Sequence, residues 1–559
     1  MQKKREDKED KKMNVLSKCI SSLEKVMPDT KFDSLEEYGE ATALKNEIFS
    51  YQIAYTLPES GRARLSVETA STVPGITVRS VGYVPSLLPC YDDHDEYIIS
   101  DKPGLFPDVL EDVGKSGFTV SKNRVSALWI TVDARGVLPA THHIKVILRN
   151  GEESVCETVF TLRILDAELE KQSLIYTNWF HADCLCDRYS VAAFSEKHWE
   201  IIGNYMKNAS DHGMNMILTP IFTPALDTAV GSERTTVQLL DVYKNGDSYT
   251  FGFDRLIRWI ETAEENGIEY FELAPLYTQW GAANAPKIIA EENGETRRIF
   301  GWETDAYGDG YVNFLSQLIP ALTAFFKERN MQSRVYFHVS DEPSADSPEK
   351  YNAASVLIRK YTGGEFNMID ALSSYGFYET GAVKTPVAST NHIEPFIENG
   401  VKDLWCYYCC GQYKDVSNRF IAQPSLQNRI LGIQLYKFGI KGFLHWGYNF
   451  WNSVLSYEMI DPYYVTDAKE AYPSGDAFIV YPGNDGKPVS SLRFEVFFDG
   501  IQDMRALEAL EKKIGREKTL EFIDSGLKEK ITFSRFPRNN AWLLELREKI
   551  NRILSDKER

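Results

Sequence analysis

The pattern of hydrophobic and polar positions changes along the chain and divides it into three stretches. From about residue 48 to residue 165, short segments such as Leu128-Trp-Ile-Thr-Val-Asp133 alternate apolar and polar residues, and Gly, Pro and Asp separate them. Alternation with a period of two is typical of half-buried antiparallel strands, and several such strands in series predict a β-sandwich over residues 41–170. The mixed charge run before it predicts a solvated tail or helix over residues 1–40.

After residue 165 the pattern becomes strand, loop and helix in repeated order. Ser195, for example, is a predicted N-cap, and the apolar residues after it fall on one helical face. Eight strands are predicted in this stretch: Leu174–Trp179, Asn215–Pro220, Ile268–Leu273, Val335–Ser340, Phe366–Leu372, Pro386–Thr390, Asp403–Tyr408 and Gly442–Trp446. Strands that alternate with helices in this number predict an α/β fold with a (β/α)8 TIM-like barrel over residues 171–505. The charged last stretch, residues 506–559, predicts a helical C-terminal extension packed on the barrel.

A doubly wound open sheet is the alternative to the barrel. No predicted strand is followed by a G-x-G-x-x-G or G-x-x-x-x-G-K-S/T loop, which disfavours a nucleotide-binding open sheet.

Composition and charge narrow the classes of partner. The 559 residues carry a formal net charge of −18, which argues against nucleic acid, because phosphate binding needs clustered cations. No run approaches the ~18 consecutive apolar residues of a membrane helix, and no apolar secretory segment follows the charged start. We therefore expect a cytoplasmic location and no membrane insertion. The eight cysteines show no zinc-finger spacing and are expected to be reduced thiols, with no metal and no cofactor.

Carboxylates and aromatic rings collect at the predicted carboxyl ends of the strands, where a barrel of this kind has its active site. Indole and phenol faces stack on the C–H surfaces of sugars, and carboxylates bond sugar hydroxyls, so this combination indicates a carbohydrate site. The residues at or near these ends are Asn178, His181, Glu272, Trp280, His338, Asp341, Glu342, Trp405, Tyr407, Tyr408, Trp446, Asn449 and Trp451.

The adjacent carboxylates Asp341 and Glu342 are the sharpest feature. Neighbours on one strand point to opposite faces, so they cannot easily clamp a glycosidic bond as the ~5–5.5 Å carboxyl pair of a conventional retaining glycosidase does. They suit a substrate-assisted reaction, in which the 2-acetamido oxygen of the sugar attacks the anomeric carbon. A pair that only caps the following helix is the structural alternative.

Several segments resemble glycoside hydrolase family 123, the β-N-acetylgalactosaminidases. They are His212-Gly-Met-Asn-Met-Ile-Leu-Thr-Pro-Ile-Phe-Thr-Pro-Ala-Leu-Asp-Thr228, Phe337-His-Val-Ser-Asp-Glu-Pro343, Leu404-Trp-Cys-Tyr-Tyr-Cys-Cys-Gly411, Gly442-Phe-Leu-His-Trp-Gly-Tyr-Asn449, Tyr481-Pro-Gly483 and Ser491-Leu-Arg-Phe-Glu-Val-Phe-Phe-Asp-Gly-Ile-Gln-Asp503. Each segment is weak alone, but all of them in order form a specific match over most of the predicted barrel.

The resemblance implies a retaining exo-hydrolase of terminal β-linked N-acetylgalactosamine in glycans such as those of glycosphingolipids, without a metal or organic cofactor. It implies that Glu342 is the general acid/base and Asp341 the residue that orients the acetamido group. Tyr407 is the expected contact to the acetamido oxygen, with Tyr408 as its rival. Sugar contacts are expected from Trp405, Trp446, Trp451, Asn449, Glu272 and Arg493.

Three other functions remain open at this point. A different glycosidase could use Glu272 as its nucleophile and Glu342 as its acid, and would accept sugars without an acetamido group. A non-catalytic glycan-binding protein would keep the aromatic residues but would not need the paired carboxylates. A metal-dependent sugar isomerase with His181, His338 and His445 as ligands is disfavoured, since such sites need acidic partners on successive strands.

Overall fold

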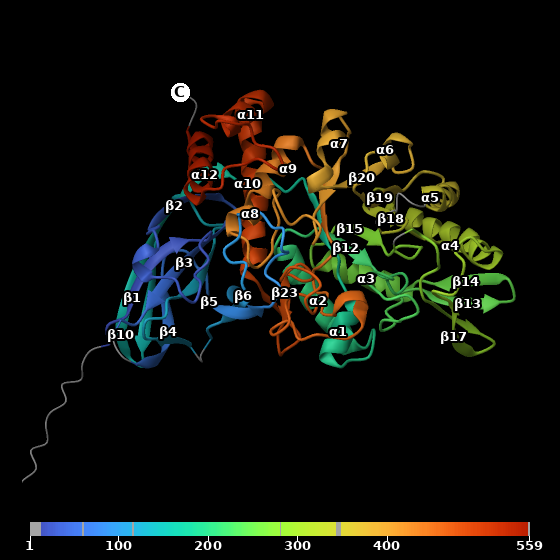
Figure 1. Cartoon of the computed structure of the whole chain (residues 1–559), viewed down its shortest axis with the longest axis horizontal. Coiled ribbons are helices and arrows are strands. Elements are labelled where there is room, and N and C mark those ends of the chain that lie inside the picture. The colour runs from blue at the N-terminus through green and yellow to red at the C-terminus, as the bar shows by residue number, and fades with distance from the viewer. Residues whose placement is uncertain (1–12, 59–60, 115–116, 280, 342–347, 557–559) are drawn as a thin grey trace, which may run out of the picture.

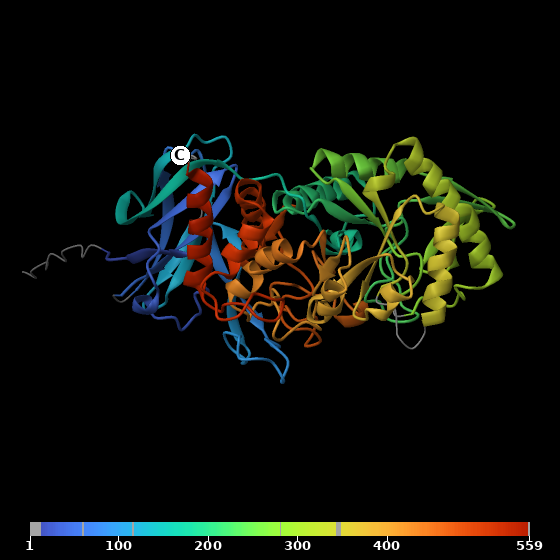
Figure 2. The same ribbon diagram turned by 90° about the horizontal axis from the view of Figure 1, so that it is seen from above.

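The computed structural model describes residues 13–58, 61–114, 117–279, 281–341 and 348–556. Two five-stranded sheets come first, an eight-stranded parallel sheet with helices follows, and long helices end the described chain. Figure 1 shows the first two sheets in blue and cyan on one side and the parallel sheet on the other, with helix α10 between them and the red helix α12 above the first sheets. Figure 2 shows the same elongated arrangement from above.

The first sheet has the order β1 (Leu16–Ser21), β3 (Ile48–Thr56), β8 (Ser126–Asp133), β5 (Gly75–Ser86) and β6 (Gly104–Asp112). The second has the order β2 (Glu40–Lys45), β10 (Glu153–Glu168), β9 (Ala140–Asn150), β4 (Arg62–Ala70) and β7 (Phe118–Ser121). All pairs are antiparallel except β2 with β10. The rings of Tyr51 on β3 and Phe160 on β10 stack at 4.1 Å, so the inner faces of the two sheets share one core.

Strand β1 corrects the prediction of a tail or helix over residues 1–40. It pairs with β3 from Leu16 opposite Thr56 to Ser21 opposite Tyr51, and it buries Cys19 and Ile20. The strand was missed because its six residues alternate too briefly to stand out beside the charged run. Residues 1–12 lie outside the described chain.

All eight predicted strands of the second stretch are present, within two residues at each end. They form one parallel sheet in the order β11 (Ile175–Asn178), β22 (Gly442–His445), β21 (Trp405–Tyr407), β20 (Thr385–Ser389), β19 (Asn367–Leu372), β18 (Val335–His338), β15 (Tyr270–Leu273) and β12 (Met216–Thr219). The two end strands, β11 and β12, meet at Asn215. Its backbone N–H donates to the Tyr176 carbonyl (3.1 Å), and its side-chain oxygen accepts the Tyr176 backbone N–H (2.8 Å). The sheet is therefore nearly closed.

Helices alternate with these strands. They are α1 (Ala182–Tyr189), α2 (Glu196–Asp211), α3 (Asp254–Glu265), α4 (Asp309–Glu328), α5 (Pro348–Thr362), α6 (Gly376–Glu379), α7 (Glu394–Glu398), α8 (Ser425–Arg429) and α9 (Leu431–Phe438). Helix α2 begins as predicted, because the Ser195 hydroxyl accepts the His198 N–H at 3.3 Å. None of the described helices is long and apolar enough to span a membrane.

Two smaller sheets were not predicted. Strands β14 (Ser248–Gly252), β13 (Asp241–Asn245), β16 (Ile288–Glu292) and β17 (Glu295–Phe300) form a four-stranded sheet in that order, and β23 (Val480–Pro482) pairs with β24 (Pro488–Ser490). The four-stranded sheet lies in the connections after β12 and β15, at one end of the molecule in Figure 1.

The C-terminal helices are α10 (Leu492–Ile514), α11 (Arg516–Asp524) and α12 (Asn540–Ser555). Helix α10 begins before the predicted boundary at residue 505 and is buried on nearly all sides. Its Phe497 ring contacts the rings of Tyr176 and Phe443 at 4.8 and 5.3 Å on the parallel sheet. Because α10 also contacts β3 and β6, it joins the two halves of the molecule.

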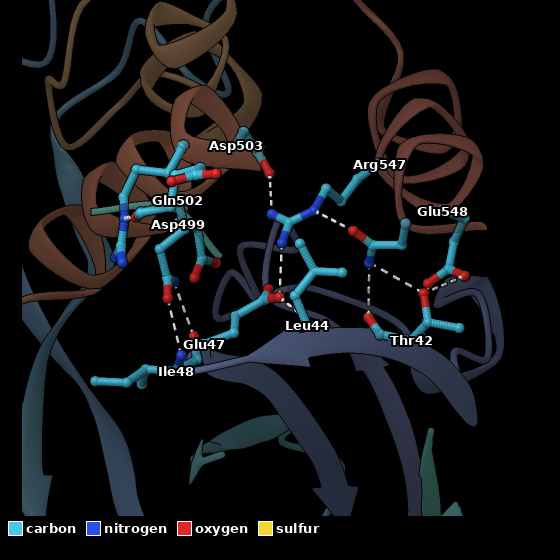
Figure 3. A network of polar contacts seen from close by, with 12 residues as sticks. Thr42, Leu44, Glu47, Ile48, Asp499, Gln502, Asp503, Arg547 and Glu548 are labelled. Atoms are coloured by element: carbon cyan, nitrogen blue, oxygen red, sulfur yellow. Dashed lines mark hydrogen bonds and ion pairs between the residues drawn. The ribbon is translucent and has the colours of Figure 1, made fainter. Parts of the chain in front are cut away.

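A polar network connects the C-terminal helices to the first sheets (Figure 3). Arg547 on α12 donates to Glu47 at 2.6 Å and to Asp503 on α10 at 2.7 Å. Glu548 accepts the backbone N–H and the hydroxyl of Thr42, each at 2.8 Å. The charges of Arg547, Glu47 and Asp503 are buried but paired, which is the arrangement that a low-dielectric interior requires.

Candidate active site

A pocket lies at the carboxyl ends of the parallel strands. Residues on or just after most of the eight strands contribute to its wall, so the nearly closed sheet gathers side chains that are far apart in the sequence. The lining residues are Trp179, Leu226, Asp227, Gln279, Asp341, Ala371, Tyr407, Cys409, Cys410, Leu444, Trp446 and Tyr472.

Three residues of the predicted site line this pocket: Asp341, Tyr407 and Trp446. Asp341 is half-buried and follows β18 by three residues. Glu342 and Trp280, two other predicted site residues, lie outside the described residues.

Tyr407 and Tyr408 have opposite surroundings, because successive side chains of a strand point to opposite faces. Tyr407 faces the pocket, and its hydroxyl lies 3.4 Å from the hydroxyl of Ser373. Tyr408 is fully buried against the rings of Phe443 and His445, at 5.0 and 5.4 Å. The geometry thus brings Tyr407, and not Tyr408, to the pocket.

Glu272 lies beneath the pocket and is enclosed by donors. Its two oxygens accept the Trp179 indole N–H, each at 3.1 Å, and Oε1 also accepts from His338 Nδ1 at 3.0 Å. Neither Glu272 nor His338 is among the pocket-lining residues, and both are completely buried. Glu272 and His338 were predicted to contact the sugar, but they lie below the pocket wall. Instead they support Trp179, which does line the pocket.

His338 is a buried cation between carboxylates. Burial alone lowers its pKa, but the hydrogen bond to Glu272 and the charges of Asp370, Glu272 and Asp341 outweigh burial and raise the pKa to about 9. Burial raises the pKa of Asp370 to about 6, against the opposing effect of His338. Asp370 also accepts the backbone N–H groups of Val339 and Ser340 at 3.2 and 3.4 Å, so it fixes the segment that leads to Asp341.

Trp446 is half-buried in the pocket wall, and its indole N–H donates to Asp476 at 2.9 Å. Burial raises the pKa of Asp476 to about 7. The neighbouring His445 is fully buried, and its Nδ1 accepts from Arg419 at 2.7 Å. Burial, followed by the charges of Arg419 and Arg493, lowers the pKa of His445, so this ring is neutral.

Six further predicted sugar contacts have structural partners instead of facing the pocket. Asn178 accepts from Arg419 at 2.6 Å, and Asn449 exchanges two hydrogen bonds with the backbone of His181, at 2.9 and 3.0 Å. The His181 ring bonds Arg234 (3.1 Å) and the Trp446 carbonyl (3.0 Å), and burial lowers its pKa to about 3. These residues fix the loops that follow the strands.

The remaining three are Trp405, Trp451 and Arg493. Trp405 faces the same way as Tyr407 but lies one layer deeper, with its ring 5.6 Å from that of Tyr336. Trp451 donates its indole N–H to the Val480 carbonyl at 3.1 Å. Arg493 on α10 forms a two-pronged ion pair with Asp108 on β6, at 2.9 and 3.0 Å, and so holds the two halves of the molecule together.

Sequence reasoning missed most of the loop residues of the pocket. Asp227 falls within the segment 212–228 that carries the family resemblance, and Cys409 and Cys410 fall within the segment 404–411, so a signal existed for these three. Tyr472 lies in no recognisable motif. Among the described residues, His, Cys, Asp and Glu side chains do not gather in groups that could hold a metal ion.

Carboxylates and aromatic rings in a pocket at the carboxyl ends of a nearly closed parallel sheet are an arrangement typical of glycoside hydrolases. A model of the glycoside hydrolase 123 catalytic domain matches residues 179–510, more than half of the chain. The chain therefore belongs to glycoside hydrolase family 123, and the resemblance seen in the sequence is confirmed.

One solved structure agrees with this assignment at the level of the fold. A family 123 glycoside hydrolase from Clostridium perfringens, described in work on glycolipid glycan hydrolysis, matches with a TM-score of 0.74 and 14% identity, over 97% of this chain and 98% of that chain. A family 39 glycoside hydrolase from Bacteroides cellulosilyticus WH2 matches at a TM-score of only 0.35, with 10% identity, over 83% of this chain and 81% of that one. A search of curated protein sequences finds no match to this chain.

Proposed function

We propose that this glycoside hydrolase is a retaining exo-enzyme that releases terminal β-linked N-acetylgalactosamine by substrate-assisted catalysis, on a (β/α)8 barrel preceded by a β-sandwich. One observation carries the mechanism: Asp341 and Tyr407 line the same pocket, whereas Glu272, the alternative nucleophile, is enclosed by Trp179 and His338. The family membership supports the sugar, and the Clostridium perfringens relative supports a glycolipid glycan as one source of it.

In the first step, the carbonyl oxygen of the 2-acetamido group attacks the anomeric carbon, and the bond from this carbon to the aglycone oxygen breaks. Glu342 donates a proton to the departing oxygen. The product is a cyclic oxazolinium ion, in which the acetamido nitrogen carries the developing positive charge. Asp341 accepts the N–H of this group and offsets its charge, and the Tyr407 hydroxyl donates to the acetamido oxygen.

In the second step, Glu342 removes a proton from water, and the water oxygen attacks the anomeric carbon from the side that the aglycone left. The oxazolinium ring opens and restores the acetamido group, so the β-configuration is retained. The cationic His338 beneath the site favours the ionised form of Asp341, since opposite charges stabilise each other at short range.

The decisive experiment compares chromogenic β-glycosides that differ only at C2. We expect turnover of the 2-acetamido galactoside and little or none of the 2-hydroxy galactoside. A thiazoline that mimics the cyclic ion should inhibit strongly, because such a compound resembles the intermediate. Comparable turnover of the 2-hydroxy sugar, or a covalent glycosyl adduct on Glu272, would overturn the proposal.

The roles of the two adjacent carboxylates are separated by a series of leaving groups. Glu342→Gln should harm substrates with poor leaving groups most, because these need protonation of the departing oxygen. Asp341→Asn should reduce the rate for all leaving groups, by about 10²–10³-fold, as the loss of a preorganised electrostatic contact does. The reverse pattern would exchange the two roles.

A further inference from the structure

Asp227 is a second carboxylate of the pocket, and neither the sequence motifs nor the proposed reaction gives it a role. It lies on the loop after β12 and is half-buried in the pocket wall. Its Oδ1 accepts the hydroxyl of Tyr472 at 3.0 Å and the backbone N–H of Leu455 at 3.2 Å. Its Oδ2 has no hydrogen-bond partner among the described residues. This oxygen is buried, and an ionised carboxylate only accepts hydrogen bonds, so the ionised form of Asp227 lacks a donor at Oδ2.

The position of Asp227 is fixed by strained backbone. Asp227 itself has a φ of 41°, in the left-handed region that non-glycine residues rarely adopt. Its N–H donates to Gln279 at 2.5 Å, and its carbonyl accepts from Ser456 at 2.7 Å. Leu455 and Ser456, which hold it, have φ values of 55° and 54°. Backbone strain of this kind persists only where the surrounding structure enforces it, and it collects at ligand-binding sites.

Tyr472 is positioned in the same way. Three consecutive non-glycine residues before it, Ala468, Lys469 and Glu470, are left-handed, with φ values of 51°, 65° and 58°. Each such residue costs about 1–2 kcal/mol, so this turn needs support. Asp467 supplies the support: Oδ1 accepts the Glu470 N–H at 3.0 Å, and Oδ2 accepts the N–H groups of Leu87 and Leu88, at 3.2 and 3.1 Å, from the loop after β5.

The surroundings of Asp227 indicate a neutral ligand rich in hydroxyl groups. The ring of Tyr472 contacts Trp446 at 5.6 Å, so the carboxylate lies beside an aromatic wall. Arg234, the cation that acts on Asp227, is already paired with Asp183 at 2.7 and 2.8 Å. Burial raises the pKa of Asp227, and a donated O–H would stabilise its ionised form.

We propose that Asp227, held by Tyr472, is a specificity-determining residue that accepts a hydrogen bond from one hydroxyl of the bound sugar, at C3, C4 or C6. The inference rests on the proposed function, since it takes the pocket to hold a 2-acetamido sugar. Asp227 thus recognises the part of the sugar that does not react, while Asp341 and Tyr407 act on the acetamido group. A site built to bond a hydroxyl discriminates strongly against sugars that lack it, because its own polar group is then left without a partner.

The test combines protein variants with deoxy substrates. The proteins are the wild type, Asp227→Asn and Tyr472→Phe, and the substrates are the chromogenic 2-acetamido galactoside and its 3-, 4- and 6-deoxy forms. Asparagine has the size of aspartate and tolerates left-handed backbone, so Asp227→Asn should fold, which thermal unfolding checks. Asp485→Asn is the matched control, because Asp485 lies on the exposed turn between β23 and β24.

The wild type should lose about 10- to 150-fold in kcat/KM on one of the deoxy sugars, the range expected for one hydrogen bond to a charged group. Asp227→Asn should lower kcat/KM on the parent sugar by a similar factor. On that same deoxy sugar, kcat/KM of the variant should be little lower than that of the wild type. Tyr472→Phe should show the same selectivity with a smaller loss, and Asp485→Asn should match the wild type.

An equal loss on all substrates would show that Asp227 only supports the loops, and would overturn the inference while leaving the proposed function intact. A glycosyl adduct on Asp227 would make it a nucleophile and overturn both. A wild type that cleaves no 2-acetamido glycoside at all would overturn the proposed function and, with it, this assignment.

Discussion

At the scale of single residues, two phenols that are adjacent in the sequence have different surroundings. Tyr407 lines the pocket, and Tyr408 is fully buried with a hydroxyl that has no hydrogen-bond partner among the described residues. The same chemical change, Tyr to Phe, can therefore separate catalysis from stability at neighbouring positions.

We expect Tyr407→Phe to lower kcat/KM on the 2-acetamido galactoside by about 10- to 100-fold, because the phenol would stabilise the acetamido oxygen in the transition state. Tyr408→Phe should leave kcat/KM unchanged and keep or raise the melting temperature, since it removes a buried polar group without a partner. Steady-state kinetics and thermal unfolding of both variants check this. Loss of activity in Tyr408→Phe alone would reverse the assignment.

The sequence predicted the kind of residue in the site better than the individual residues. Strand periodicity correctly separates the two faces of β21, but it does not show how far below the pocket a side chain lies. Trp405 was therefore expected in the pocket, although it fills the layer below. Trp451, Asn449 and Arg493 were selected for their chemistry and have structural partners instead. Asp227 and Tyr472 reach the pocket along loops, whose course depends on tertiary contacts that a sequence pattern does not contain.

At the scale of elements, the buried strands were predictable because each apolar run is short and bounded by turn residues. The four-stranded sheet was missed although its two hairpins have two-residue turns that contain glycine, Gly246-Asp247 and Asn293-Gly294, which favour tight antiparallel pairs. Those strands are largely polar and exposed, so hydrophobic alternation does not mark them.

Helices α9 and α10 approach each other at two glycines. A Cβ atom on Gly432 would lie 1.8 Å from the carbonyl oxygen of Gly500, which is a backbone atom and cannot turn aside. This contact lets α10 lie against the parallel sheet.

Gly432→Ala should therefore lower the free energy of unfolding by about 3 kcal/mol or more, since the two helices must separate to admit the methyl group. Gly310→Ala is the matched control in helix α4, where nothing lies within 4 Å of the added Cβ. That variant should gain about 0.4–1 kcal/mol through the smaller entropy of its unfolded chain. Urea unfolding measures both, and an equal effect of the two substitutions would contradict the packing argument.

At the scale of the whole molecule, buried ionisable groups on α10 should set the pH dependence of stability. Burial raises the pKa of Asp499 to about 7, and the charges of Asp503 and Glu47 add to this, while Arg429 and the hydroxyl of Ser22 oppose it. The pKa of Asp499 is therefore higher in the folded than in the unfolded state. Its contribution to the free energy of unfolding is fully present below about pH 4 and is lost as the pH rises through about 7.

Asp499→Asn, which keeps this side chain neutral, should therefore gain stability relative to the wild type on going from pH 4.5 to pH 8, by about 2–4 kcal/mol. Glu495→Gln on the same helix should behave in the opposite way. Burial raises the pKa of Glu495, but Arg79 and His212 outweigh burial and hold the pKa far below its usual value, so its contribution is present at neutral pH and lost in acid. Urea unfolding at the two pH values tests both, and parallel changes would refute the argument.

The contacts of the loop after β5 also bear on how this enzyme can change over evolution. Leu87 and Leu88 hold Asp467, and Leu88 accepts the Ser474 N–H at 2.9 Å, so the first two sheets brace both ends of the segment that carries Tyr472. The catalytic part of the chain, which defines the family, consequently depends on the first two sheets for its structure. If recombination transferred the catalytic part without the first two sheets, the buried Arg493 would lose its partner Asp108, and the segment that carries Tyr472 would lose its support. We therefore expect the two halves of the molecule to be inherited together.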